Sequence, residues 1–143
     1  MNILIIKPNE YPRPIEIKNQ LEDLQAAVGG YIECVYPFED KVGLVVNDEG
    51  KLMGLPLNRA LRDEKDMIYD ILAGNFLVVG LTEDDFCSLT PEQMEKYEKL
   101  FHQPEAFLKL GKEILSFPIP DRCVKGQEKQ AEKSHTKGSG MER

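Results

Sequence analysis

The chain has 143 residues, a length typical of one domain with a modest apolar core. Its net charge is −7, and residues 121–143 carry six Lys or Arg against four Asp or Glu, which leaves −9 on residues 1–120. That acidic part excludes the basic surface expected of a nucleic-acid-binding protein. An acidic surface ordinarily serves solubility. The alternative is mimicry of nucleic acid, or binding in a basic groove of another protein.

The sequence indicates a cytoplasmic protein. No window approaches the long apolar run of a membrane span. The first residues, MNILIIKPNE, lack a basic flank and a cleavage site, so we expect a strand there and no signal peptide. Cys34, Cys87 and Cys123 are scattered without metal or redox spacing, as is typical of reduced thiols.

Apolar periodicity predicts the elements of the first half. Four strands are expected, over residues 2–7, 15–17, 31–38 and 42–46, the first of them buried on both faces. A helix is expected to begin at Asn19 as N-cap, with Glu22 completing a capping box. Gly29 and Gly30 end this helix as a C-cap pair.

The stretch VVNDEGKLMGLPLNRAL, residues 45–61, is the least regular part of the chain. Residues 43–54 predict a hairpin with Gly50 at a positive φ, and Asn58 is expected to cap a helical turn. Residues 62–66 are expected to form an exposed charged loop. Residues 67–72 fit a short helix or a strand equally well, and residues 75–81 predict a strand.

Two helices are expected near the C-terminus. Thr90, Pro91 and Gln93 combine an N-cap, a first-turn proline and a capping-box partner, which predicts a helix over residues 91–101. Pro104 is expected to begin a second helix, whose apolar stripe contains Phe107, Leu110, Ile114 and Leu115.

The predicted fold class is α+β, because strands precede a run of helices. It consists of a mostly antiparallel sheet of about five strands, one early helix and a C-terminal helical pair. Residues 1–118 are expected to form a single domain. Residues 119–143 have almost no apolar content after the last prolines, and a disordered tail is expected there.

The patterns of common enzymes are absent from the sequence. Gly50-Lys51 lacks the remaining residues of a phosphate loop, and no dinucleotide fingerprint follows a strand. Of the two histidines, His102 is expected near a helix end and His135 falls in the predicted tail. The acidic clusters lack the converging ligands of a metal site. We therefore expect no cofactor, no metal and no catalytic residue, although acid–base chemistry by Asp48 or Glu49 stays an alternative.

Four residues in the irregular stretch are the candidate binding residues: Asn47, Asp48, Asn58 and Arg59. Turn chemistry explains Asn47 and Asp48, whose side chains can close an Asx-turn. It explains Asn58 and Arg59 less well, because a planar guanidinium is suited to a carboxylate or phosphate ligand. Both interpretations are kept for this pair.

Three segments together resemble a domain family of unknown function: LEDLQAAVGGYIE (21–33), the stretch 45–61, and DILAGNFLVVG (70–80). The resemblance covers roughly residues 1–105. It implies an accessory protein of phages or conjugative elements of Gram-positive bacteria, and it implies no activity.

Two functions from different classes follow from these observations. The first is a non-enzymatic accessory protein that binds a host or element-encoded protein, as an anti-defence factor with an acidic surface. The second is a protein that binds a nucleotide or phosphate-type ligand through Asn58 and Arg59. Direct nucleic-acid binding and membrane association are not expected, and the oligomeric state does not follow from the sequence.

Overall fold

The computed structural model describes residues 1–125, which form two helices, ten strands and one short 3-10 helix. In chain order these are β1 (Asn2–Ile6), β2 (Arg13–Glu16), α1 (Leu21–Val28), β3 (Ile32–Val35), β4 (Val42–Asn47), β5 (Leu57–Arg62), β6 (Ile68–Ala73), β7 (Phe76–Leu81), β8 (Phe86–Cys87), α2 (Pro91–Leu100), β9 (Glu105–Leu110), β10 (Glu113–Pro118) and the 3-10 helix Asp121–Cys123. The predicted α+β class is confirmed. Neither helix in this part of the chain has the length and apolar character needed to cross a membrane.

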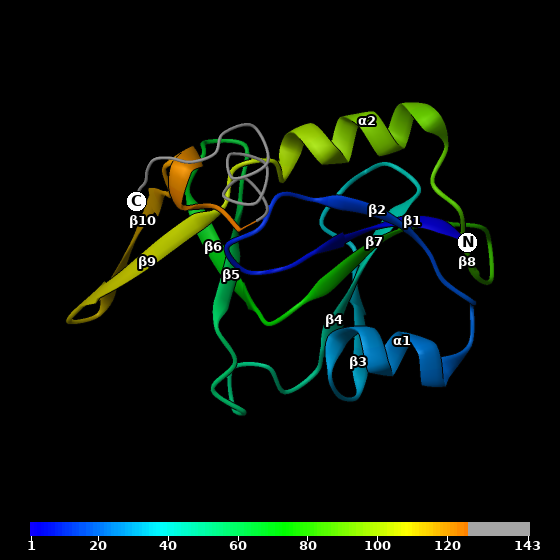
Figure 1. Cartoon of the computed structure of the whole chain (residues 1–143), viewed down its shortest axis with the longest axis horizontal. Coiled ribbons are helices and arrows are strands. Elements are labelled where there is room, and N and C mark those ends of the chain that lie inside the picture. Colours follow the sequence, from blue (N-terminus) through cyan, green and yellow to red (C-terminus); the bar gives the residue numbers. More distant parts are fainter. Residues whose placement is uncertain (126–143) are drawn as a thin grey trace, which may run out of the picture.

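The main sheet is antiparallel and has the strand order β2-β1-β7-β4-β3, with β8 as a sixth strand beside β7. Helices α1 and α2 cover its opposite faces (Figure 1). Tyr97 and Phe101 pack on one face, and Leu24 and Val28 pack on the other. Because both faces are covered, β1, β4 and β7 are almost continuously apolar and buried.

Most of the predicted elements are confirmed. The strands expected within residues 2–7, 15–17, 31–38, 42–46 and 75–81 are β1, β2, β3, β4 and β7. Helix α2 begins with the predicted capping box of Thr90 and Gln93. Helix α1 ends at Gly29, whose φ is 80°. Its predicted N-cap is wrong: Gln20 holds that position without a side-chain cap bond, and the Asn19 amide donates to Asp85 instead.

The predictions for the irregular stretch are partly wrong. Strand β4 pairs with β3 and β7, so residues 43–54 do not form a hairpin. The expected helical turn at residues 58–61 is part of strand β5, which pairs with β6 in a separate two-stranded sheet. Residues 67–72, which fitted either class, belong mainly to β6. Side-chain burial favours the extended conformation here, since Leu61 and Leu72 belong to the same core cluster as Tyr97 and Phe101.

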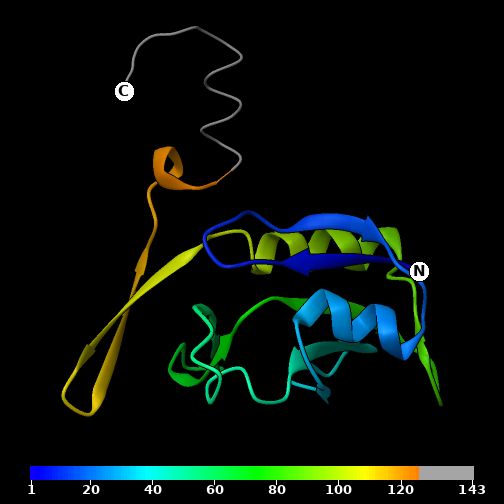
Figure 2. The same cartoon turned by 60° about the horizontal axis from the view of Figure 1, so that its bottom comes forward.

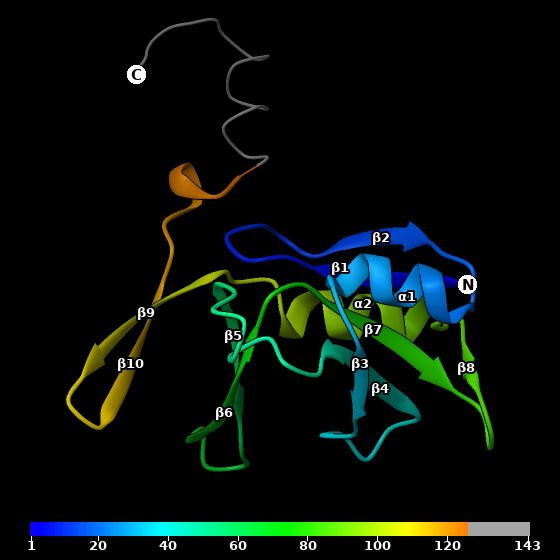
Figure 3. The same cartoon turned by 90° about the horizontal axis from the view of Figure 1, so that it is seen from below.

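The predicted second C-terminal helix is wrong. Residues 105–118 form the hairpin β9–β10, which projects away from the rest of the described chain in all three views (Figures 1, 2 and 3). The turn contains Gly111 at φ 60°, a conformation that favours glycine and suits a two-residue hairpin turn. Leu108 and Leu110 in β9, and Leu115 and Phe117 in β10, follow the two-residue period of strands, whereas Phe107, Leu110 and Ile114 follow the helical period, and the glycine decides between them.

The packed chain continues beyond the predicted domain boundary at residue 118. Val124 is fully buried, and the Lys125 amide donates to the Asn9 carbonyl over 3.0 Å. Residues 119–125 therefore belong to the domain and not to a tail. The rest of the predicted tail, residues 126–143, lies outside the described residues.

Candidate functional site

Asn58 and Arg59 lie inside the protein, with exposed fractions of 0% and 1%. The Asn58 amide nitrogen donates to the carbonyl of Ile6 at 2.9 Å and to that of Gly74 at 2.8 Å. Its oxygen accepts a hydrogen bond from Arg59 at 2.9 Å. Asn58 thus holds the end of β1 and the turn between β6 and β7 against β5.

The Arg59 guanidinium spreads over three acceptors that carry no net charge. Besides Asn58, it donates through Nε to the Phe101 carbonyl at 2.9 Å and through Nη2 to the Glu10 carbonyl at 2.7 Å. The Phe101 carbonyl is at the C-terminus of α2, where the helix dipole favours a cation. Burial lowers the pKa of Arg59 to about 10, against an opposing effect of Glu105, so the side chain stays protonated at neutral pH.

These bonds explain why an Asn-Arg pair stands at this point of the sequence. The two side chains join four segments, which end at or include Ile6, Glu10, Gly74 and Phe101. A phosphate-type ligand needs donors that face solvent, whereas the bonded donors of Asn58 and Arg59 face backbone carbonyls and the Asn58 side-chain oxygen in the interior. The geometry therefore gives this pair a structural role.

Asn47 and Asp48 follow strand β4 and differ in exposure. The Asn47 amide donates to the Val28 carbonyl near the end of α1 at 3.1 Å, and its oxygen accepts the Glu49 amide at 2.8 Å, which is the predicted Asx-turn. Asp48 is exposed, and its backbone amide donates to Tyr31. Of the four candidate residues, only Asp48 presents its side chain to solvent.

Gly50 is required for close packing and not for a positive φ. The φ angle of Gly50 is not positive, and a Cβ at this position would lie 2.7 Å from the Ala73 carbonyl oxygen on β6. We expect Gly50→Ala to lower the free energy of unfolding by about 2 kcal/mol, because the backbone of β6 has to shift. Urea denaturation measures this. Leu52→Ala in the same turn is the control and should change stability by less than about 0.5 kcal/mol, because Leu52 is 87% exposed.

A pocket of about 170 Å³ lies where the turn after β4 meets β3 and β6. Buried side chains of Val46, Ile71 and Leu72 contribute to its lining. The charged residues around it are Glu33, Asp48, Glu49, Lys51 and Asp70. We call it the acidic pocket. It is smaller than the roughly 300–1,000 Å³ of most small-molecule sites, so its size suits a single side chain better than a nucleotide.

The charge of the acidic pocket is only partly neutralised. Lys51 Nζ lies 2.7 Å from Asp70 Oδ1, which pairs one carboxylate with the one cation of the lining. Within residues 1–125, Glu33, Asp48 and Glu49 take part in no ion pair. Three carboxylates around a pocket with a partly apolar lining attract a cation and repel a phosphate.

Strand β3, which supplies Glu33 and Val35 to the acidic pocket, is an edge strand of the main sheet. Its other neighbour position is free within the described residues, and its sequence, IECV, contains no proline. The opposite edge strand, β2, carries Pro14, which disfavours the addition of another strand. An extended peptide can therefore add to β3 and place alternate side chains beside the pocket.

His102 is the histidine of the described chain, and its contacts do not indicate catalysis. It follows α2, its Nδ1 lies 3.1 Å from Glu98 Oε2, and its ring stacks on Tyr11 at 4.6 Å. Residues 1–125 contain no group of three His, Cys, Asp or Glu side chains placed to hold a metal ion.

A family model described as a domain of unknown function, DUF3846, matches residues 1–102. The chain belongs to this family. No curated protein and no solved structure matches the chain. The part matched to DUF3846 contains the Asn58–Arg59 pair and the acidic pocket, and it ends before the β9–β10 hairpin.

The sequence did not reveal Glu33 and Asp70 as members of one site. Glu33 alternates with apolar neighbours in a predicted strand, which places it on the face opposite Ile32 and Cys34, but nothing in the sequence brings β6 to that face. The fold does so, because it places residues 70–73 of β6 at the same pocket as Glu33 of β3 and Val46 of β4.

Proposed function

We propose that this DUF3846 protein is a non-enzymatic accessory protein that binds a basic protein partner at the acidic pocket and the adjoining edge of β3. The observation that carries this proposal is the set of three carboxylates without an ion pair in the described residues, Glu33, Asp48 and Glu49, around a partly apolar pocket of single-side-chain size. A Lys or Arg side chain fits both features, because its aliphatic stem contacts the apolar lining and its charge meets the carboxylates.

The partner class follows from the overall charge. Residues 1–120 carry a net charge of −9, which steers the protein toward positively charged surfaces and away from nucleic acid. A basic groove that normally binds nucleic acid is the surface that fits best. Together with the resemblance to phage and conjugative-element proteins, this leads us to propose a cytoplasmic, anti-defence role for the protein.

The first test measures binding of a short peptide of alternating lysine and valine by calorimetry and by amide NMR. We expect chemical-shift changes centred on residues 33–35, 46–52 and 70–73. The dissociation constant should rise at least tenfold between about 50 and 500 mM salt, because the contact is largely electrostatic. A dissociation constant that does not change with salt concentration would contradict the proposal.

Matched charge-reversal variants separate the pocket from the general charge of the protein. Glu33→Lys with Glu49→Lys removes two pocket carboxylates. Glu83→Lys with Glu92→Lys makes the same change in net charge at exposed positions outside the pocket. We expect the first pair to abolish peptide binding and the second to weaken it less than about threefold. Equal losses would show unspecific attraction and would overturn the assignment of the site.

A further inference from the structure

The hairpin β9–β10 carries an apolar face that no described residue covers. Its register pairs Ala106 with Phe117 and Leu108 with Leu115, so these four side chains share one face with Leu110. Leu108, Leu110, Leu115 and Phe117 are 49%, 54%, 37% and 47% exposed. An exposed group of this kind marks an interaction site, because soluble monomers rarely expose contiguous apolar surface of a few hundred Å² or more.

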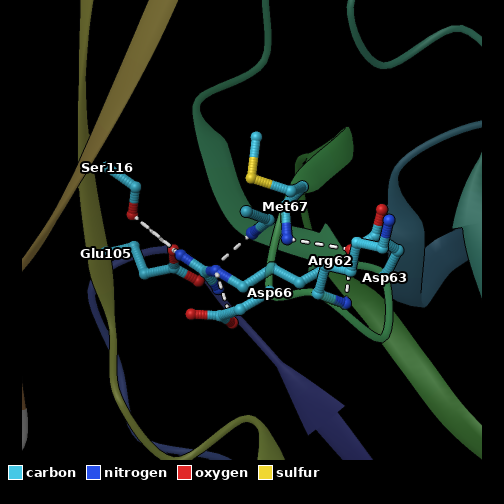
Figure 4. A network of polar contacts seen from close by, with 8 residues as sticks. Arg62, Asp63, Asp66, Met67, Glu105 and Ser116 are labelled. Carbon is cyan, nitrogen blue, oxygen red and sulfur yellow. Dashed lines mark hydrogen bonds and ion pairs between the residues drawn. The ribbon is translucent and has the colours of Figure 1, made fainter.

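The other face of the hairpin fixes its orientation on the domain. Glu105 accepts a 2.7 Å bond from Arg62 and also accepts the Ala60 backbone amide, and Ser116 donates to the same carboxylate (Figure 4). The Glu105 side chain is only 9% exposed. This anchor holds the base of the hairpin against β5 and leaves its apolar face directed away from the anchor.

Residues 1–125 do not supply a cover for this face. Residues after the hairpin return to the domain, where Val124 is buried. Residues 126–143 contain one alanine and one methionine as their only apolar residues. A two-stranded hairpin with one bare apolar face is marginal in water, so a second molecule that covers the face would stabilise it.

We propose that the apolar face of the β9–β10 hairpin is the surface through which two copies of this chain associate. Residues 105–118 contain two Lys and two Glu, so the hairpin is neutral on a protein of net charge −7. A basic partner is drawn to the acidic pocket and gains little charge attraction at the hairpin, whose apolar face carries one charged side chain, Glu113 opposite Leu110, next to Lys112 in the turn. A second acidic copy approaches with least repulsion at such a face.

The projecting shape of the hairpin supports the same occupant. Because the hairpin extends away from the sheet and helices, two hairpins can pack face to face while the acidic bodies stay apart (Figures 2 and 3). A two-fold axis through the contact covers both faces with identical residues, as in most dimers of identical chains. The dimer would carry two acidic pockets. Self-association through the hairpin is a property beyond the proposed function.

Analytical ultracentrifugation of the full chain in reducing buffer, over a wide concentration range, tests the proposal. We expect a reversible dimer. Leu108→Glu should raise its dissociation constant at least tenfold, because the dimer would bury an unpaired carboxylate. Leu100→Glu is the matched control, since Leu100 is 57% exposed on α2, and it should leave association unchanged. Leu115→Gln provides a second, uncharged change on the same hairpin face and should also weaken the dimer.

Three results would overturn the proposal: a wild-type monomer at every concentration, a Leu108→Glu variant that dimerises normally, or a hairpin face occupied by a different protein while the chain stays monomeric. Circular dichroism and thermal unfolding show whether each variant folds. Binding of the lysine–valine peptide should be unchanged by Leu108→Glu. Failure of the dimer and failure of the pocket are therefore distinguishable.

Discussion

Arg59→Met is expected to lower the free energy of unfolding by about 3 kcal/mol. The methionine fills much of the space but leaves the carbonyls of Glu10 and Phe101, and the Asn58 side-chain oxygen, without their donor. Each buried acceptor without a partner costs about 1–3 kcal/mol, and relief of the buried charge offsets part of the total. Urea denaturation followed by circular dichroism measures the change.

Arg13→Met is the matched control for Arg59→Met, because Arg13 is an exposed arginine on the edge strand β2. It should change stability by less than about 0.5 kcal/mol. Arg59→Lys adds a second comparison, since lysine keeps the charge but lacks the fork that reaches three acceptors. If Arg59→Met left stability unchanged, the structural role of the guanidinium would be refuted.

Asn58→Ala is expected to lower the free energy of unfolding by a similar amount, about 3 kcal/mol. It removes both donors that hold the Ile6 and Gly74 carbonyls, at a position with no exposed surface, and leaves a small cavity. Thermal unfolding should show the loss as a lower midpoint with an unchanged far-ultraviolet spectrum at low temperature. Asn19→Ala is the control, because that amide lies on the surface and donates to Asp85.

The double variant tests whether Asn58 and Arg59 act together. Their side chains share one hydrogen bond, so Asn58→Ala and Arg59→Met combined should cost at least 1 kcal/mol less than the sum of the single changes. Asn19→Ala combined with Arg59→Met should be additive. Additive costs at positions 58 and 59 would mean that the two residues stabilise their segments independently.

The sequence predicts those elements whose signal is local. The capping box at Thr90, the left-handed residue at Gly29 and the β-branched run before Gly80 each depend on neighbours within a few positions, and each element appears in the structure. The hairpin at residues 105–118 was predicted wrongly because its apolar residues fit two periods. Gly111 in the middle of that run was the local sign of a turn.

The candidate site could be predicted only in part, because it depends on contacts between distant segments. The sequence singles out Asn58 and Arg59 since turn geometry does not explain them. Their acceptors are carbonyls near residues 6, 10, 74 and 101, which no pattern in the chain reveals. An arginine with 1% exposure is also rare enough that a surface position is the ordinary expectation. The acidic pocket requires β6 beside β4, and that placement depends on the whole fold.

The position of β7 in the sheet has a consequence for synthesis of the protein. Strand β7 lies between β1 and β4, yet it comes last of the three in the sequence. A ribosome that adds about 5–20 residues per second needs roughly 4–15 s to pass from β1 to β7. During that time β1, the apolar segment NILII, lacks the strand β7 that later pairs with it. This segment is where we expect chaperones to bind the nascent chain, and slow codons between residues 47 and 76 would prolong its exposure to aggregation.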